Sequence, residues 1–276
     1  MSDEPTDEPG FRALTEKIAH ERGFGCPSYK DGCLRRRIAV RMRACAATDF
    51  RAYSARLDRD PEEWERLLDA LTINVTKLFR DAEVWETVAN RVIPALWELN
   101  APRIDVWSAG CASGEELYTL AALFHRHAER SMGLRKVDRV HILGSDIDRA
   151  SIERARRGVY AEESFSEVPP AIRARYFSPD APYAVAPELK ALVQVERRDL
   201  LSEPAPQSGL QLITCRNAII YFDRKSQEPL LRRFHEALAP DGFLVLGKVE
   251  TLLGALRSLF EPVDARARIF RRVTTP

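Results

Sequence analysis

Residues 106–121 read VWSAGCASGEELYTLA and place two glycines and two adjacent acids between an apolar run and a helical pattern. The apolar run predicts a buried strand, and the residues after Gly114 predict a helix. Glycine between a strand and a helix permits a tight turn and the close approach of a ligand. Gly110 and Gly114 occupy this turn, so we expect it to line a binding site at the carboxyl end of the strand.

The composition of this turn argues against a phosphate ligand. A dinucleotide-binding turn carries GxGxxG and a nucleoside triphosphate loop carries GxxxxGK[ST], whereas this turn reads GCASGEE. Glu115 and Glu116 would repel a pyrophosphate and would suit a positive charge, an amino group or free hydroxyls. The alternative is that these acids only stabilise the N-terminus of the helix through its dipole. We favour the ligand for Glu115 and the alternative for Glu116.

A second predicted strand, VHILGSDID at 140–148, carries Asp146 near its carboxyl end. An acid at this position typically accepts hydrogen bonds from the hydroxyls of a ribose. A ribose, a positive centre and no phosphate together describe S-adenosylmethionine. The sequence therefore predicts S-adenosylmethionine as cofactor, with S-adenosylhomocysteine as product.

A polar pair, Arg216–Asn217, follows a further apolar run in CRNAIIYFD at 215–223, with Tyr221 close behind. We expect the methyl acceptor to bind at this edge. Amino-directed nucleic-acid methyltransferases carry a D/N-P-P-Y/F tetrapeptide here, and a cytosine-C5 enzyme needs a Pro-Cys nucleophile. The chain has neither, so we expect no nucleic-acid substrate and a structural role for Cys215.

Polar residues also interrupt the apolar stretch LTINVTKLFRD at 71–81, namely Asn74, Thr76 and Arg80. Thr76 and Arg80 are four residues apart and would lie one above the other on a helix. Taken alone, these residues indicate a capping asparagine and a solvated arginine.

The elements that position these residues alternate between strand and helix. Strands are expected at the apolar, β-branched runs 103–110, 140–148, 192–200, 209–217, 243–250 and 267–273. Helical patterns follow the first, second and fourth of these runs. This alternation predicts a Rossmann-like, doubly wound α/β fold with a mostly parallel sheet.

Other regions complete the predicted organisation. Residues 1–10 are acidic and proline-rich and are expected to form a disordered lead-in. Residues 11–80 read as a small all-helical domain, and residues 81–276 as the α/β domain. Within the latter, 158–199 mixes prolines with aromatic residues and predicts an inserted subdomain, which either covers the sheet edge or contacts a substrate or partner.

The predicted helix at 28–45 is strongly basic. Between Tyr29 and Asp60 there are nine Lys/Arg against four Asp, a local excess of five positive charges in a chain whose net charge is +1. Such an excess suggests an acidic partner for this segment.

Composition limits the remaining possibilities. The 276 residues are 45% hydrophobic, enough for a core, and no apolar run approaches the roughly 20 residues of a membrane span. The N-terminus lacks the plan of a secretory signal, so we expect a cytoplasmic protein without membrane insertion. Five cysteines without a CxxC pair, and histidines without HExxH spacing, predict no metal. A monomer is expected.

Taken together, these segments resemble the chemotaxis-receptor methyltransferase family, CheR. The resemblance rests on TINVTKLFRD, VWSAGCASGEELYTLA, SDIDRASIERARRGVY, CRNAIIYFDRKSQEPLLRRFHEALAPDGFLVLG and the basic YKDGCLRRRIAVRM. It covers nearly the whole chain from Phe11. It implies a class I methyltransferase fold with a small inserted β-subdomain, and methyl transfer from S-adenosylmethionine to glutamate side chains of methyl-accepting chemoreceptors, which gives methyl esters.

The resemblance also implies roles for individual residues. Cofactor contacts are expected from Asn74, Thr76, Arg80, Gly110, Gly114, Glu115, Asp146, Asp199, Leu200, Arg216 and Asn217. Arg80 and Tyr221 match residues near the departing methyl group and are the expected catalytic residues. The basic helix is expected to face the acidic cytoplasmic helical bundle of the receptor through Arg35, Arg36, Arg37, Arg41 and Arg43.

The chain departs from the family pattern in two places. Lys248–Val249 replace a small or polar pair before Glu250, and Lys248 would pair with Glu250, pair with an acidic substrate, or lie outside the site without a role. The insert has one hairpin-like stretch at 183–196, which favours recruitment without a tethering receptor peptide. The alternatives left open are a methyltransferase acting on another carboxylate or a small molecule, and a regulator that binds the cofactor without turnover.

Overall fold

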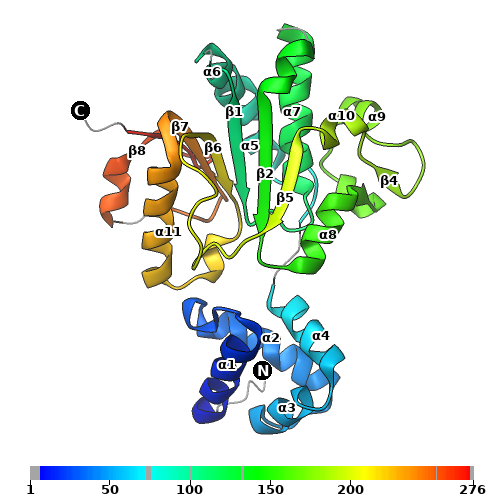
Figure 1. Cartoon of the computed structure of the whole chain (residues 1–276), viewed down its shortest axis with the longest axis vertical. Coiled ribbons are helices and arrows are strands. Elements are labelled where there is room, and N and C mark those ends of the chain that lie inside the picture. Colours follow the sequence, from blue (N-terminus) through cyan, green and yellow to red (C-terminus); the bar gives the residue numbers. More distant parts are fainter. Residues whose placement is uncertain (1–6, 73–75, 100, 132–133, 253, 274–276) are drawn as a thin grey trace. The chain divides into compact units, whose positions relative to one another are not determined.

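The computed structural model describes residues 7–72, 76–99, 101–131, 134–252 and 254–273 (Figure 1). The chain divides into two compact units. The helical unit comprises Met1–Ile73 and Tyr221–Gln227, and the α/β unit comprises Asn74–Ile220 and Glu228–Pro276. The segment around Arg80, which the sequence grouped with the helices, therefore belongs to the α/β unit.

Aspartate side chains cap three of the α-helices described in residues 7–72. These helices are α1 (Glu8–Arg22), α2 (Asp31–Ala44), α3 (Phe50–Leu57) and α4 (Pro61–Leu71). Asp7, Asp49 and Asp60 each accept a hydrogen bond from the N–H three residues later, at 3.1, 2.8 and 3.2 Å. Because Asp7 caps it, α1 begins at Glu8 and takes in the end of the predicted lead-in.

A buried carboxylate joins three helices of this unit. Glu63 of α4 accepts hydrogen bonds from Nε and Nη2 of Arg41 on α2, at 2.9 and 2.6 Å, and from the hydroxyl of Tyr53 on α3, at 2.7 Å. The Glu63 side chain is 1% exposed. Burial opposes its ionisation, but hydrogen bonds from its partners outweigh burial and lower the pKa of Glu63.

The segment 221–227 joins the helical unit through its own main chain. Lys30 N donates to Tyr221 O at 3.0 Å, and Asp223 N donates to Ser28 O at 2.9 Å. Between these contacts, the rings of Tyr29 and Phe222 lie edge to face with centroids 5.1 Å apart. Residues distant in sequence therefore complete this small unit.

The α/β unit contains a seven-stranded sheet of order β5-β2-β1-β6-β7-β9-β8. Its strands are β1 (Ile104–Ala109), β2 (Val140–Asp146), β5 (Val193–Arg197), β6 (Leu210–Cys215), β7 (Leu238–Leu246), β8 (Phe260–Asp264) and β9 (Ile269–Arg272). The first five pair in parallel, and β9 lies antiparallel to β7 and β8. The predicted Rossmann-like, mostly parallel fold is confirmed.

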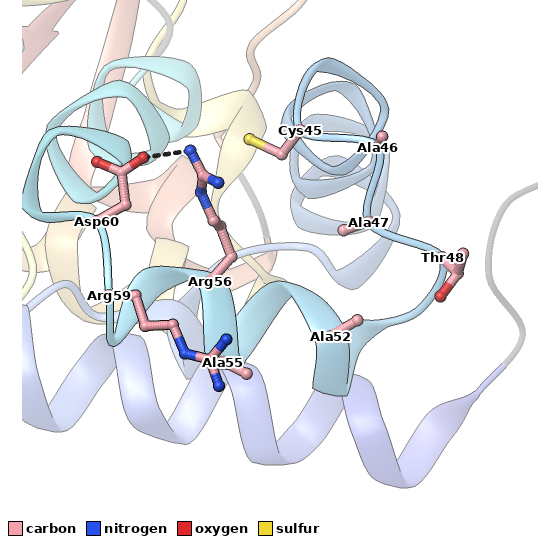
Figure 2. A pocket seen from close by; sticks show the side chains of 9 residues that line it. All are labelled: Cys45, Ala46, Ala47, Thr48, Ala52, Ala55, Arg56, Arg59 and Asp60. Atoms are coloured by element: carbon pink, nitrogen blue, oxygen red, sulfur yellow. Dashed lines mark hydrogen bonds and ion pairs between the residues drawn. The ribbon is translucent and has the colours of Figure 1, made fainter.

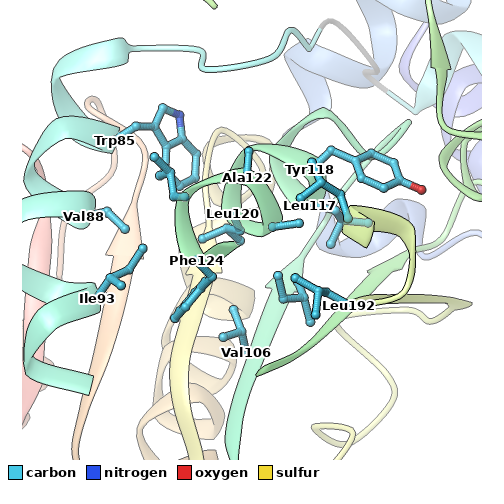
Figure 3. Packing of buried hydrophobic residues seen from close by; sticks show 14 of the residues in the cluster. Trp85, Val88, Ile93, Val106, Leu117, Tyr118, Leu120, Ala122, Phe124 and Leu192 are labelled. Atoms are coloured by element: carbon cyan, nitrogen blue, oxygen red, sulfur yellow. The ribbon is translucent and has the colours of Figure 1, made fainter. Parts of the chain in front are cut away.

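Successive residues of a strand point to opposite faces of the sheet. Side chains from helices pack against both faces. Val106 of β1 lies in a core cluster with α5 (Ala82–Thr87), α6 (Ile93–Glu98) and α7 (Glu115–Ser131) (Figure 3). Its neighbour Trp107 packs against Phe234 of α11 (Arg224–Ala237), with ring centroids 5.4 Å apart. One π-helical turn, Val88–Val92, joins α5 to α6.

The insert is more helical than the predicted β-subdomain. Its strands β3 (Val159–Tyr160) and β4 (Tyr183–Ala184) have two residues each and pair antiparallel. They enclose α9 (Pro170–Tyr176), and α10 (Pro187–Lys190) follows. The predicted hairpin at 183–196 is wrong, because α10 separates β4 from β5, which pairs with β2 at the edge of the main sheet.

The other sequence expectations differ from the structure in small ways. The strand expected at 243–250 ends at Leu246, so Lys248 and Glu250 lie in the loop that follows. The short strand β8 was not predicted. Among the described residues, no helix is both long and apolar enough to cross a membrane.

The Glu63 contacts predict a large stability difference between adjacent glutamates. Changing Glu63 to Gln leaves the guanidinium of Arg41 without its charge partner, and breaking a buried pair costs about 3–5 kcal/mol. We expect E63Q to lower the stability of the helical unit by an amount in this range. The measurement is hydrogen exchange of peptides from α2 to α4 in the full chain.

Glu62 supplies the matched control, because its side chain is 80% exposed and E62Q should change the stability by less than about 1 kcal/mol. The Glu63 contribution should be complete above pH 4.5, its ordinary pKa, and should disappear as pH falls through the lowered pKa of the folded state. Equal protection of E63Q and E62Q would contradict the structural role of Glu63.

Candidate active site

The glycine turn, residues 110–114, follows β1 and is built from left-handed backbone. Gly110, Ala112 and Gly114 have φ of 81°, 46° and 90°. Ala112 is held in this unfavourable conformation because its N–H donates to Oδ2 of Asp146 at 2.9 Å. A Cβ at position 114 would lie 2.9 Å from that of Ala155, which leaves no room for a side chain.

Two acidic side chains flank the glycine turn. Glu115 is 4% exposed and lies with both oxygens within 3.0 Å of Ser113 Oγ. Asp146 accepts main-chain N–H groups from Ala112 and Asp148, each at 2.9 Å. Burial raises the pKa of Glu115 and the pKa of Asp146, so an ionised form of either favours a positive or hydroxyl-bearing partner.

Glu116 makes structural contacts that the sequence did not predict. Its Oε1 accepts hydrogen bonds from Ser108 Oγ of β1 at 2.7 Å and from Thr214 Oγ1 of β6 at 2.5 Å. Its Oε2 lies 3.6 Å from Arg216. Glu116 lies in the first turn of α7, as the dipole interpretation requires, and it also fixes this helix to two central strands.

The sheet order reverses between β1 and β6, and loops from both strands meet there. A Cβ on Gly110 would lie 3.1 Å from Ala218 Cβ and 3.7 Å from Leu200 Cδ1. Leu200 and its neighbours are held by Arg233 of α11, whose guanidinium donates to the carbonyls of Leu200, Leu201 and Glu203 at 2.6–3.2 Å. Such a reversal is the usual binding crevice of an open α/β sheet.

Asp199 shapes the loop after β5 with its own side chain. It accepts hydrogen bonds from Leu201 N at 2.9 Å and from Ser202 Oγ at 2.7 Å. Asp199 and Leu200 thus lie in one loop beside the glycine turn.

A second buried carboxylate organises the loop after β6. Glu250 is 3% exposed and accepts hydrogen bonds from the main-chain N–H groups of Asn217, Ile220 and Gly247, whose distances are 3.1 Å for Asn217 and 2.6 Å for Gly247. Asn217 has φ of 59°, a left-handed conformation that asparagine tolerates. Burial raises the pKa of Glu250 against these hydrogen bonds.

The Arg80 turn, residues 77–83, is also left-handed on both sides of Arg80. Phe79 has φ of 56° and Asp81 has φ of 60°. Residues 76–80 are therefore a turn, and Thr76 does not lie above Arg80 on a helix. Such strain around one residue marks a candidate functional position, because it persists only where surrounding contacts enforce it.

Contacts from several elements enforce this turn. Phe79 N donates to Thr119 Oγ1 of α7 at 3.0 Å, and the hydroxyl of Thr119 donates to Glu115 O at 2.7 Å. The Arg80 carbonyl accepts from Trp85 Nε1 and from Arg216 Nη2, both at 2.9 Å. The Arg80 turn is thus linked to the helix that carries Glu115.

The insert also supports the Arg80 turn. Leu78 N donates to Ser164 O at 3.1 Å. Glu167 accepts from Ala82 N at 3.2 Å and pairs with Lys77. The insert therefore packs against the Arg80 turn.

Arg216, an expected cofactor contact, lies against the Arg80 turn. Its side chain is 2% exposed, donates to Asp81 Oδ2 at 2.8 Å, and lies over the Trp85 ring, 4.8 Å from the centroid. It therefore holds the Arg80 turn. Two predicted residues cannot be compared with this site, since Asn74 lies outside the described residues and Tyr221 belongs to the helical unit.

The expectation that five arginines of α2 form one partner-facing surface needs correction. Arg41 binds Glu63, and Arg37 donates to Ala70 O at 2.6 Å and lies over the Tyr221 ring. Arg35 pairs with Glu8 and lies over the Phe11 ring. The sequence pattern could not distinguish these arginines from the exposed Arg36 and Arg43.

A hollow in the helical unit lies between the end of α2 and α3 (Figure 2). It is lined by Cys45, Ala46, Ala47, Thr48, Ala52, Ala55, Arg56, Arg59 and Asp60. Within it the guanidinium of Arg56 pairs with Asp60 at 2.6 Å. We assign no ligand to the hollow.

Sequence reasoning missed several residues of the site. Thr119, Arg233 and the pair Ser164–Glu167 had no recognisable motif, because their partners are main-chain atoms of distant segments. Glu250 had a signal, since it matches the acid that the family pattern places after the Lys248–Val249 pair.

The residues present fit S-adenosylmethionine. The acids beside the glycine turn are Glu115 and Asp146, whereas a phosphate would require cations there. Glu115 and Asp146 would accept hydrogen bonds from ribose hydroxyls or from an amino group. The chemistry of this set of acceptors suits a cationic nucleoside.

Comparison with known proteins identifies the family. Residues 74–269 match the model of the CheR methyltransferase, SAM binding domain, and residues 9–72 match the CheR methyltransferase, all-alpha domain. A chemotaxis protein methyltransferase of Listeria innocua is 30% identical over 250 residues, which cover 90% of this chain and 92% of the relative. One from Borreliella burgdorferi is 34% identical, with 87% of each chain covered.

An uncharacterized 104.1 kDa protein of Rhodobacter capsulatus is 36% identical over 246 residues. The match covers 88% of this chain but 25% of that relative. The Listeria relative matches 90% of the chain, and the two family models match consecutive parts of it. The chain belongs to the CheR family and is an S-adenosylmethionine-dependent methyltransferase with an N-terminal all-alpha domain.

Proposed function

We propose that this enzyme methylates glutamate side chains of methyl-accepting chemoreceptors and forms glutamyl methyl esters. The observation that carries the proposal is membership of the CheR family together with relatives that bear the name chemotaxis protein methyltransferase over about nine-tenths of the chain. The acceptor would be the cytoplasmic helical bundle of a receptor, so we also propose that the enzyme works in the cytoplasm, as a monomer.

Methyl transfer to a carboxylate requires no general base. A free glutamate has a pKa near 4.3, so its carboxylate is already ionised and nucleophilic at neutral pH. S-adenosylmethionine supplies an electrophilic methyl group on a sulfonium. The protein has to align the carboxylate with this group and to remove water from it.

Arg80 is the residue that we propose to align the acceptor. Its guanidinium would hold one oxygen of the carboxylate, and the strained Arg80 turn would fix the direction of approach. We propose that Tyr221 donates a hydrogen bond near the departing methyl group.

The cofactor would be held chiefly by the acids around the glycine turn. We propose that Glu115 and Asp146 accept its hydroxyl and amino hydrogens, and that Gly110 and Leu200 line the space beside them. Asn74, Thr76, Gly114, Asp199, Arg216 and Asn217 complete the proposed set. Asn217 and Arg216 would act partly by keeping their loops in position.

The receptor-contacting surface is proposed to be narrower than the whole basic helix. Arg36, Val40 and Arg43 follow the spacing i, i+4, i+7 and therefore share one face of α2. All three are exposed, and Val40 retains 49% of its surface. An apolar residue between two cations suits an amphipathic helix with acidic residues.

The acceptor itself is tested by labelling. The enzyme is incubated with S-adenosylmethionine carrying a labelled methyl group and with receptor-containing membranes from the source organism. We expect label on a receptor-sized band and its release as methanol in mild base, because esters hydrolyse under these conditions.

Label that resists base, or that appears on a small molecule or nucleic acid, would assign a different acceptor. Absence of any label while the cofactor still binds would favour a regulator without turnover. Heat-denatured enzyme and membranes from a strain without receptors serve as controls.

The proposed surface on α2 predicts a selective defect. Reversing both charges, R36E/R43E, should raise KM for the receptor about fivefold or more and leave the other kinetic parameters unchanged, because rim charges chiefly affect association. The matched control is R91E/R103E, which alters two arginines with side chains 55% exposed in the α/β unit. Equal KM values for the two double variants would exclude this surface.

Asp146 predicts a defect in cofactor affinity. Hydrogen bonds to a charged group contribute about 1.5–3 kcal/mol, so D146N should weaken binding of S-adenosylmethionine about ten- to a hundredfold. Isothermal titration calorimetry measures this change. The control is D105N on β1, where Asp105 pairs with Arg103. Unchanged affinity in D146N would rule out the proposed contact.

A further inference from the structure

Lys248 follows the end of β7 and reaches the Arg80 turn. Its ammonium lies 3.3 Å from Asp81 Oδ1 and also pairs with Glu83. It does not pair with Glu250, whose carboxylate accepts main-chain N–H groups. The backbone of Lys248 is itself held, since its carbonyl accepts from Arg268 Nε at 3.2 Å. Lys248 thus connects the last parallel strand to the segment that carries Arg80.

The Arg80 turn has a conformation that ordinary chain segments avoid. Asp81 tolerates its φ of 60°, but Phe79, with φ of 56°, is a bulky residue in the left-handed region. These two residues with left-handed backbone, Phe79 and Asp81, lie on either side of Arg80. The turn therefore exists in this form only while its external contacts are made.

The external contacts differ in kind. Those of Thr119 and Arg216 are buried and hold the main chain from the side of α7 and β6. Lys248 is 41% exposed and holds the carboxylate of Asp81 from β7. Asp81 is shared between two cations, with Oδ2 on Arg216 and Oδ1 on Lys248.

The charges around Asp81 explain why a cation is needed at position 248. Asp81 and Glu83 are two carboxylates near the same turn, and Arg216 also lies near Glu116. Without the Lys248 ammonium, less positive charge would offset Asp81 and Glu83. The repulsion between these two carboxylates would then favour opening the Arg80 turn.

We propose that Lys248 is a positioning residue, which fixes the Arg80 turn by binding Asp81 and so presents Arg80 to the acceptor. The proposal rests on the function proposed above for Arg80. Lys248 itself is engaged with Asp81 and Glu83, and it does not contact the acceptor carboxylate.

The first test compares K248M with K248R. An exposed ion pair shifts an equilibrium by a few-fold, so K248M should lower kcat about three- to fivefold. KM for the receptor and Kd for S-adenosylmethionine should stay within about twofold of the wild type. K248R should retain at least about half of kcat, because it keeps the charge. The control R103M removes a comparably exposed ion pair at the amino edge of β1.

Salt provides a readout that a purely structural role would not change. At saturating receptor, kcat of the wild type should fall as salt rises from about 0.05 to 0.5 M, because the Lys248 pair is screened. The kcat of K248M should be insensitive to the same change. Saturation separates this effect from the salt dependence of receptor binding, which acts on KM.

A double-mutant cycle tests the route through Asp81. If Lys248 acts through this carboxylate, D81N/K248M should have the same kcat as D81N. Losses that multiply in the double variant would overturn the proposal. A higher receptor KM with unchanged kcat in K248M would also overturn it, because Lys248 would then contact the acceptor.

Hydrogen exchange tests the positioning role of Lys248 without an acceptor. In the absence of substrate, amides of residues 76–85 should exchange faster in K248M than in the wild type or R103M. Unchanged exchange would overturn the proposal even if methylation is normal. Failure of the proposed function would be seen differently, as absence of base-labile label with wild-type enzyme.

Discussion

Two carboxylates that accept main-chain N–H groups, the half-buried Asp146 and the buried Glu250, hold the loops at the carboxyl edge of the sheet. Asp146 holds the glycine turn through Ala112, and Glu250 holds the loop after β6 through Asn217. Each of these loops contains a left-handed residue that would otherwise relax. The carboxylates lose hydration on burial, and the main-chain groups replace that water. Removing one acid would release a strained loop as well as a charge.

A chain of contacts connects the cofactor side of the site with the Arg80 turn. Glu115 begins α7, Thr119 lies one helical turn later, and its hydroxyl oxygen accepts from Phe79 N. Glu116, between them in sequence, points to β1 and β6 instead. Adjacent acids on one helix therefore serve different purposes, one beside the glycine turn and one in joining the layers.

The sequence predicted helices and strands better than it predicted the contacts of charged side chains. The alternation of strands and helices and the position of Asp146 near the end of a strand follow from local patterns, and the structure contains both. The partner of a long charged side chain depends on tertiary contacts. Arg41 and Arg43 are two residues apart in the same basic run, yet one is bound to Glu63 and the other is exposed. Lys248 likewise had two predicted partners, and the structure gives it two others.

The helical unit is not a contiguous N-terminal piece of the chain. Its contacts with Tyr221, Phe222 and Asp223 come from a segment about 150 residues downstream of α4. During synthesis, the four helices emerge from the ribosome long before these partners do. The unit can therefore reach its final form only after β6 has been made, and completion of the two units is coupled in time. A fragment that ends after α4 would lack the edge-to-face contact of Tyr29 and the main-chain bonds on either side of it.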